Sequence, residues 1–200
     1  MARTFRIASI AAILAGASWV AWVAINMATG GGLDAGPPAV QEITARAGRA
    51  LIVGYNVCLI PAALVLWRWL KPGRPELAAL ASVCGLTSLC LWAGGAAVER
   101  ITPRVEVTYL ALSGIWWCGL GVMLWSRTRV FGAFTLVLGT FALWDSLLTA
   151  LWPVPFSMYL TAAPKVPLSI VWDFALAIAL WRWAAHVSRD NLAWPAPTTI

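Results

Sequence analysis

Charged residues are scarce in this sequence: Asp, Glu, Lys and Arg make up 11% of its 200 residues, against 61% for hydrophobic residues. A soluble domain carries roughly 25% charged residues. The scarcity therefore excludes a soluble globular protein and favours one that is embedded in a membrane. The formal net charge of +6 does not indicate nucleic-acid binding, because the basic residues stand in ones and twos at the ends of apolar runs.

Residues that hold metals or cofactors are also few. The chain has one histidine, His186, and four cysteines, Cys58, Cys84, Cys90 and Cys118, which stand inside apolar runs and form no CxxC pair. We expect these cysteines to be small packing residues. The sequence contains no nucleotide-binding glycine loop and no recognisable nucleophile–base arrangement. It therefore predicts neither a metal site nor a cofactor.

Long hydrophobic runs are abundant instead. Six of them are about 20 residues long, which is the length a helix needs to cross a hydrocarbon core of about 30 Å. They lie at about residues 5–27, 50–70, 77–98, 107–125, 130–151 and 166–184. We therefore expect an all-α integral membrane protein, a bundle of six transmembrane helices that forms one domain over residues 1–200. Val40, Ile43 and Ala47 continue the helical spacing ahead of the second run, which predicts a short interfacial helix or an extension of that span.

The distribution of Lys and Arg predicts the orientation. If the N-terminus is cytoplasmic, nine of the 14 basic residues flank the cytoplasmic ends of the runs and five flank the outer ends. Basic residues are enriched on the cytoplasmic side of membrane proteins. The sequence therefore predicts a multi-pass protein of a bacterial-type inner membrane, with both termini in the cytoplasm.

Tryptophan is unusually frequent, with 14 residues in the chain. About half of them stand at run ends, where interfacial aromatic belts form. The second and sixth runs both end in Leu-Trp-Arg-Trp, at residues 66–69 and 180–183. The first run carries small residues four apart, Ala8, Ala12 and Gly16, which would let a neighbouring helix approach closely.

Two acidic residues stand inside predicted membrane spans. Asp145 follows Trp144 in the fifth run, and Asp173 follows Trp172 in the sixth. Each is about six or seven residues from the outer end of its run, so both should lie about 10 Å below the outer boundary. An ionisable residue inside a span is costly and is usually functional. Asp145 and Asp173 are therefore the candidate catalytic residues.

Other polar and aromatic side chains are expected in the same outer half, whereas the inner halves hold little beyond Ser, Thr and Cys. The candidate ligand-binding residues are Tyr55, Asn56, Glu99, Glu106, Tyr109, Trp116, Trp144 and Trp172. This asymmetry predicts an aromatic pocket in the outer half of the bundle. In it, a carboxyl group could donate a proton, and indole faces could hold a cation.

The chain resembles a large family of uncharacterised bacterial six-helix membrane proteins. The residues that carry the resemblance are Arg6-Ile7-Ala8-Ser9-Ile10-Ala11 at the start, a long outer loop, and a last helix that begins Val166-Pro167 and ends Leu180-Trp181. In that family an acid follows the proline of the last helix. Asp173 matches it, with Asp where Glu is expected. The resemblance implies the six-helix fold and no particular activity.

The pairs Trp144-Asp145 and Trp172-Asp173 are also similar in kind to those of integral-membrane terpene cyclases. Such enzymes protonate an olefin or epoxide with a buried acid and surround the resulting cation with aromatic rings. This resemblance implies an intramembrane cyclase or isomerase in which Asp145 and Asp173 supply the acid.

The main functional hypothesis is a protein that binds a hydrophobic isoprenoid- or lipid-like small molecule, and its catalytic form is a protein that also transforms this molecule by acid catalysis. One alternative is the substrate-binding component of a membrane transporter, docked through an exposed small-residue face. Another is a non-catalytic accessory subunit of a larger membrane complex. A homo-oligomer or a partner subunit is compatible with each of these.

Two further alternatives concern Asp145 and Asp173 themselves. In the structural alternative, the two acids bond to Asn56, Tyr55 or Arg100 and only fix helix register. In the other, they conduct protons or ions across the membrane.

Overall fold

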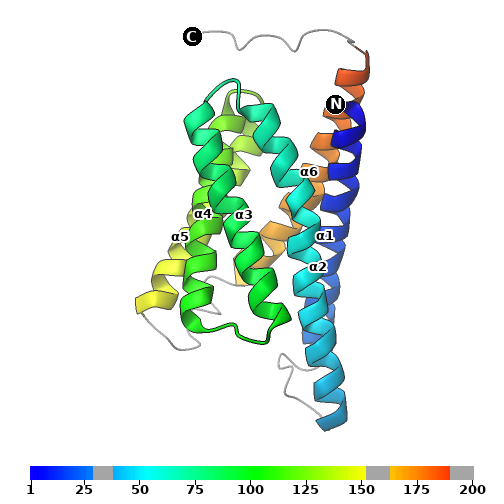
Figure 1. Cartoon of the computed structure of the whole chain (residues 1–200), viewed down its shortest axis with the longest axis vertical. Helices are drawn as coiled ribbons and strands as arrows, with labels where there is room; N and C mark the ends of the chain where they lie inside the picture. Colours follow the sequence, from blue (N-terminus) through cyan, green and yellow to red (C-terminus); the bar gives the residue numbers. More distant parts are fainter. Residues whose placement is uncertain (29–37, 152–162, 190–200) are drawn as a thin grey trace.

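The computed structural model describes residues 1–28, 38–151 and 163–189, and these residues form six helices (Figure 1). The helices are α1 (Ala2–Ala28), α2 (Pro38–Leu70), α3 (Pro75–Ala97), α4 (Pro103–Trp125), α5 (Arg129–Leu151) and α6 (Ala163–Arg189). All six are long and apolar enough to cross a membrane. The prediction of an all-α, multi-pass membrane protein with six spans is confirmed.

Two helices are longer than their hydrophobic runs. α2 begins at Pro38 rather than near residue 50, so Val40, Ile43 and Ala47 belong to an extension of the second span and not to a separate interfacial helix. α6 begins at Ala163, which brings Lys165 into the helix. Backbone hydrogen bonding continues through these polar turns, so hydropathy alone underestimates the length of both helices.

Proline and a side-chain cap fix the starts of α3 and α4. Pro75 and Pro103 occupy the first turns, where a missing backbone N–H costs nothing. The side chain of Thr102 accepts a hydrogen bond from the backbone N–H of Val105, which caps α4.

The helices are arranged as a closed ring. Each helix packs against its neighbours in the sequence, and α6 returns to pack against α1, while the contact between α5 and α6 is the least extensive of the six. The beginning of α1 and the end of α6 lie at the same end of the bundle (Figure 1). We call the opposite end, where α1, α3 and α5 end and α2, α4 and α6 begin, the distal end.

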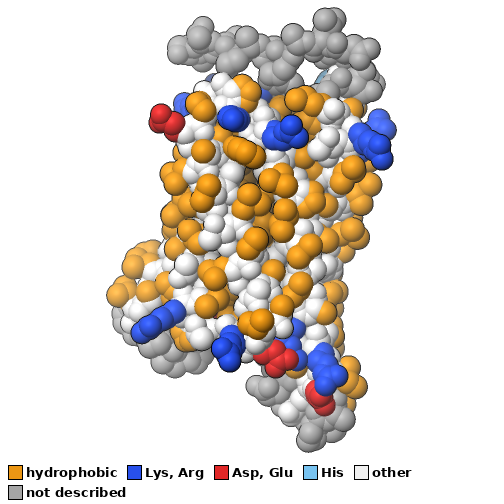
Figure 2. All heavy atoms as spheres, viewed as in Figure 1, with side chains coloured by type: hydrophobic (Ala, Val, Ile, Leu, Met, Phe, Trp, Pro, Cys, Tyr) orange, Lys and Arg blue, Asp and Glu red, His pale blue; other side chains and the backbone are white. Residues whose placement is uncertain are grey.

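The surface matches a membrane-spanning protein. Figure 2 shows hydrophobic side chains around the middle of the visible face and charged side chains toward its two ends. Large apolar side chains such as Leu80, Val137 and Ile178 are about half exposed, as expected where lipid replaces water.

Glycines allow α4 and α5 to pack backbone against backbone. A Cβ on Gly139 would lie 2.6 Å from the Cys118 nitrogen and 3.0 Å from the Gly114 oxygen, and a Cβ on Gly132 would lie 3.0 Å from the Gly121 oxygen. Two glycines seven residues apart on each helix therefore face each other in antiparallel register. Small residues at such positions let transmembrane helices make close van der Waals contact.

The small residues of α1 serve the same purpose against α6. A Cβ on Gly16 would lie 3.1 Å from the Phe174 ring and 3.3 Å from the Asp173 Cβ. The Ser9 hydroxyl donates to the Ala177 carbonyl oxygen at 2.8 Å. The predicted close approach along α1 is confirmed at Gly16, and Ala8 and Ala12 are fully buried.

Trp172 occupies the centre of the ring. It is fully buried, its ring centroid lies 6.0 Å from that of Trp116 and 5.9 Å from that of Trp117, and its Nε1 donates to the Thr135 Oγ1 at 3.0 Å. The hydrogen bond crosses from α6 to α5, where direct helix packing is least extensive. The indole therefore joins α4, α5 and α6.

We expect Thr135→Val to lower the free energy of unfolding by about 0.5–1.5 kcal/mol, because the buried indole N–H of Trp172 loses its acceptor while the side-chain volume changes little. Reversible unfolding in mixed detergent micelles measures this. In the background of Trp172→Phe the same Thr135 substitution should cost much less. An equal cost in both backgrounds would contradict a role for the hydrogen bond.

Candidate functional site

Asp173 is a fully buried carboxyl group in the membrane-spanning part of α6. Its exposed fraction is 0%, and neither carboxyl oxygen has a hydrogen-bond partner among the described residues. It lies ten residues into α6, about 15 Å from the distal end. Nearly all buried polar groups in proteins are hydrogen-bonded, so an exception needs an explanation.

Residues from three other helices lie around Asp173. Gly16 of α1 packs against its Cβ. Tyr55 of α2 and Tyr109 of α4 are close enough for their phenol groups to interact electrostatically with the Asp173 carboxylate. The acid therefore points into the interior of the ring and not toward lipid.

A polar stripe leads along α6 from the distal end to Asp173. Lys165, Ser169 and Asp173 are four residues apart, so they lie on one face of the helix. Ser169 is 4% exposed, and its hydroxyl accepts a hydrogen bond from the Trp19 Nε1 at 2.8 Å. Lys165 precedes the sixth apolar run, at about residues 166–184, so hydropathy alone does not include it in this stripe. The four-residue spacing was the signal that could have revealed it.

Asp145 forms an ion pair across the seam between α5 and α6. Its Oδ2 accepts a hydrogen bond from the Lys165 Nζ, and the two side chains are 7% and 16% exposed. Glu106 of α4 interacts electrostatically with both. The prediction of a buried acid at residue 145 is confirmed, and it pairs with Lys165, a partner that was not predicted from the sequence. We call Glu106, Asp145 and Lys165 the distal charge cluster.

Tyr109 connects the two acids. Its phenol interacts with both Asp145 and Asp173, and its hydroxyl hydrogen-bonds to Ser113. Its ring stacks on Trp92 at a centroid distance of 4.5 Å. Both carboxyl groups are therefore close enough to this one aromatic side chain to interact with it electrostatically.

Aromatic rings on α1 and α2 form a stacked group that includes Tyr55. Trp19 stacks on Trp22 at 4.7 Å and on Tyr55 at 5.1 Å between ring centroids. Trp116 and Trp172, also predicted to line the site, are buried in the central packing. Trp144 is 53% exposed and so lies on the outer face of α5. The prediction that Trp144 lines the pocket does not fit this placement. Asp145, the next residue, points into the bundle, and adjacent residues on a helix point in different directions, so Trp144 points outward.

Two other predicted residues, Asn56 and Glu99, make contacts with other groups. Asn56 is fully buried, its Nδ2 donates to the Ile52 carbonyl oxygen at 2.7 Å, and its Oδ1 has no partner among the described residues. Glu99, in a left-handed backbone conformation (φ 56°) after the end of α3, pairs with Arg49 at 2.8 Å. The side chain of Glu99 is 64% exposed, so this pair belongs to the distal surface.

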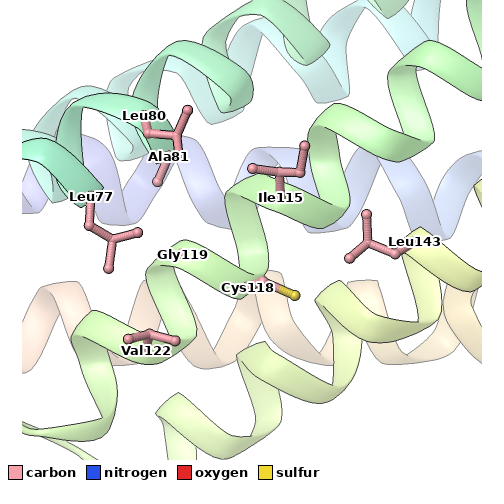
Figure 3. Close-up of a pocket in the computed structure, with 8 residues that line it drawn as sticks. All are labelled: Leu77, Leu80, Ala81, Ile115, Cys118, Gly119, Val122 and Leu143. Atoms are coloured by element: carbon pink, nitrogen blue, oxygen red, sulfur yellow. The ribbon is translucent and has the colours of Figure 1, made fainter.

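An apolar groove of about 280 Å³ lies elsewhere, along the outer face of α4 between α3 and α5 (Figure 3). It is lined by Leu77, Leu80, Ala81, Ile115, Cys118, Gly119, Val122 and Leu143. None of the predicted site residues contributes to it. Leu80, Ile115 and Val122 are more than one-third exposed, so the groove opens toward the lipid.

Substitutions at Asp145 and Lys165 test whether their ion pair stabilises the fold. We expect Asp145→Asn to lower the free energy of unfolding by about 1–3 kcal/mol, because Lys165 then lacks its carboxylate in a low-dielectric surrounding. Asp145→Asn combined with Lys165→Gln should recover most of that loss in a double-mutant cycle. Additive losses in the double variant would show that the pair is not coupled.

Metal ligands do not assemble anywhere in the described ranges: no three His, Cys, Asp or Glu side chains there are placed to hold an ion. The two resemblances drawn from the sequence stay predictions. Neither a protein-family model, nor a curated protein, nor a solved structure matches this chain.

Proposed function

We propose that the protein binds a hydrophobic isoprenoid- or lipid-like small molecule inside the distal half of the bundle, with the polar head of the molecule at Asp173. The observation that carries the proposal is that this carboxyl group is buried, has no hydrogen-bond partner among the described residues, and points into the ring. Burying such a group without a partner costs several kcal/mol. A ligand that donates a hydrogen bond to Asp173 would offset this cost.

The surroundings of Asp173 suit such a ligand. Small-molecule sites are mainly apolar and aromatic, with a few polar groups that fix the head of the ligand. Trp19, Tyr55 and Tyr109 supply aromatic surface around the acid, and Gly16 lets α1 pack closely against α6 beside it. Ionisable residues within spans commonly mark ligand sites or counter-ions.

If the bound molecule is also transformed, the proton donor in this proposal is Asp173. Asp145 already pairs with Lys165 and is less suited to that step. An acid-catalysed cyclisation or isomerisation would begin with proton transfer from the Asp173 carboxyl to the olefin or epoxide of the ligand. The neighbouring aromatic faces would stabilise the resulting cation.

The same proposal places the protein in a bacterial-type inner membrane with both termini in the cytoplasm, because nine of the 14 basic residues flank the end of the bundle where the termini lie. The transporter alternative requires an exposed small-residue face on α1. Ala8, Ala12 and Gly16 are instead buried in the ring, so α1 does not offer that face.

The experiment is native mass spectrometry of the purified protein combined with identification of the released small molecules. Wild type should carry a hydrophobic compound that Asp173→Asn loses and that Glu76→Gln retains. Glu76 lies in the first turn of α3, at the end of the bundle away from Asp173, so it controls for the loss of one negative charge. The same bound compounds in all three proteins would contradict the proposal.

A further inference from the structure

We propose that the head of the ligand is a cation, specifically a protonated amine, and that Asp173 is its counter-ion. This inference rests on the binding part of the proposed function and adds the chemical class of the ligand; it replaces the proton-donor role, because a carboxylate that serves as a counter-ion has no proton to donate. It depends on the balance of charge in the distal half of the bundle, on the unpartnered state of Asp173, and on the aromatic rings beside it.

Acids outnumber bases around the interior of the distal half. Glu106, Asp145 and Asp173 come from α4, α5 and α6, and Lys165 interacts with the first two of these acids. Lys165 is engaged by Asp145 and Glu106, and no charged group among the described residues compensates Asp173. One positive charge on the ligand would bring this interior closer to neutrality, whereas a carboxylate or phosphate head would add to the repulsion.

The second observation is the burial of Asp173. A cluster of acids at a surface is solvated by water, but Asp173 is fully buried, and both of its oxygens lack partners. An ionised carboxylate in that position needs a charge-assisted hydrogen bond to be stable. An ammonium group carries up to three N–H donors and supplies both the charge and the hydrogen bonds.

The aromatic side chains favour the same head. Tyr55 interacts electrostatically with Asp173 and stacks on Trp19, which itself stacks on Trp22. Electron-rich ring faces attract cations within about 6 Å of their centroids and do so more strongly when water is excluded. Anionic heads gain nothing from these faces.

The polar stripe of α6 offers a route for the head from the distal end. Lys165, Ser169 and Asp173 follow one another at one-turn intervals on the same face. Lys165 pairs with Asp145 at the seam between α5 and α6, the least extensively packed in the ring, whereas Ser169 and Asp173 contact α1. An amine that follows this face from the distal end passes the distal charge cluster, in which two acids outnumber Lys165, before it reaches Asp173.

The test uses three ten-carbon prenyl compounds that differ only in the head: geranylamine, geraniol and geranic acid. Binding is measured by titration calorimetry on the full chain in nanodiscs of zwitterionic lipid, with empty nanodiscs to subtract partitioning. Wild type should bind geranylamine about 10- to 100-fold more tightly than geraniol. Geranic acid should bind more weakly than geraniol. The preference for the amine should shrink to less than about twofold in Asp173→Asn and stay unchanged in Glu76→Gln.

The outcomes separate the two proposals. If geraniol binds wild type as tightly as geranylamine, and both lose affinity in Asp173→Asn, the ligand site stands and the cationic head is refuted. If the preference for the amine persists in Asp173→Asn, the counter-ion role is refuted. If the substitution changes the affinity for none of the three compounds, the proposed function fails as well. If Asp173→Asn does not fold, the ratio of the wild-type affinities for geranylamine and geraniol decides by itself whether the site prefers a cationic head.

Discussion

Gly139→Leu is expected to destabilise the bundle by more than about 3 kcal/mol. The glycine faces backbone atoms of α4, with the Cys118 nitrogen 2.6 Å from where a Cβ would stand. Backbone cannot move aside as a flexible side chain can, so α4 and α5 must separate along their length. Unfolding with SDS in mixed micelles should then show a lower midpoint, or no folded population at all.

The position of the glycine, and not the loss of glycine as such, should cause this effect. Gly94 in α3 is the matched control, because a Cβ there would meet nothing within 4 Å. Gly94→Ala should be neutral or stabilise by up to about 1 kcal/mol. Gly139→Ala should already cost more than about 1 kcal/mol. If Gly139→Leu unfolds at the wild-type midpoint, α4 and α5 do not pack through this seam.

If the proposed site exists, Asp173→Asn should reduce the affinity for geranylamine by about 10- to 100-fold, the value of a hydrogen bond to a charged group. The same substitution should change the stability of the ligand-free protein by less than about 1 kcal/mol, because Asp173 makes no hydrogen bond among the described residues that the amide would break. Affinity and stability should thus respond differently. Titration of the delipidated protein and SDS unfolding measure the two quantities.

Asp145 provides the comparison for Asp173. Both are aspartates in neighbouring helices and both interact with Tyr109, but Asp145 is paired with Lys165. Asp145→Asn should therefore lower stability more than Asp173→Asn and should affect ligand binding less. The opposite order, with Asp173→Asn unfolding the protein and Asp145→Asn abolishing binding, would exchange the roles assigned to the two acids.

Helix number and the burial of the two acids were predictable, because both follow from hydropathy. A run of 20 apolar residues has few alternatives to a membrane span, and an acid inside such a run must face the interior of the bundle. Side-chain direction was less predictable. Trp144 stands next to a buried acid and yet is exposed, because adjacent residues on a helix point about 100° apart.

The hydrophobic runs alone do not predict which helices pack together or through which residues. Lys165 precedes the apolar part of α6, so its ion pair with Asp145 depends on how far the helix extends and on which helix lies beside it. The glycines of α4 and α5 are visible as a seven-residue repeat, but their partner helix is defined only by the fold. Helix-helix recognition in membranes depends on such local fits, which hydropathy does not encode.

Electron density beside Asp173 is the most direct test of the account. A crystal structure of the natively purified protein, grown from a lipidic mesophase, should show an elongated hydrophobic molecule with a polar head about 3 Å from a carboxyl oxygen of Asp173. A carboxyl group that is hydrogen-bonded to another side chain of the same protein, with tightly packed residues and no extra density around it, would contradict the account.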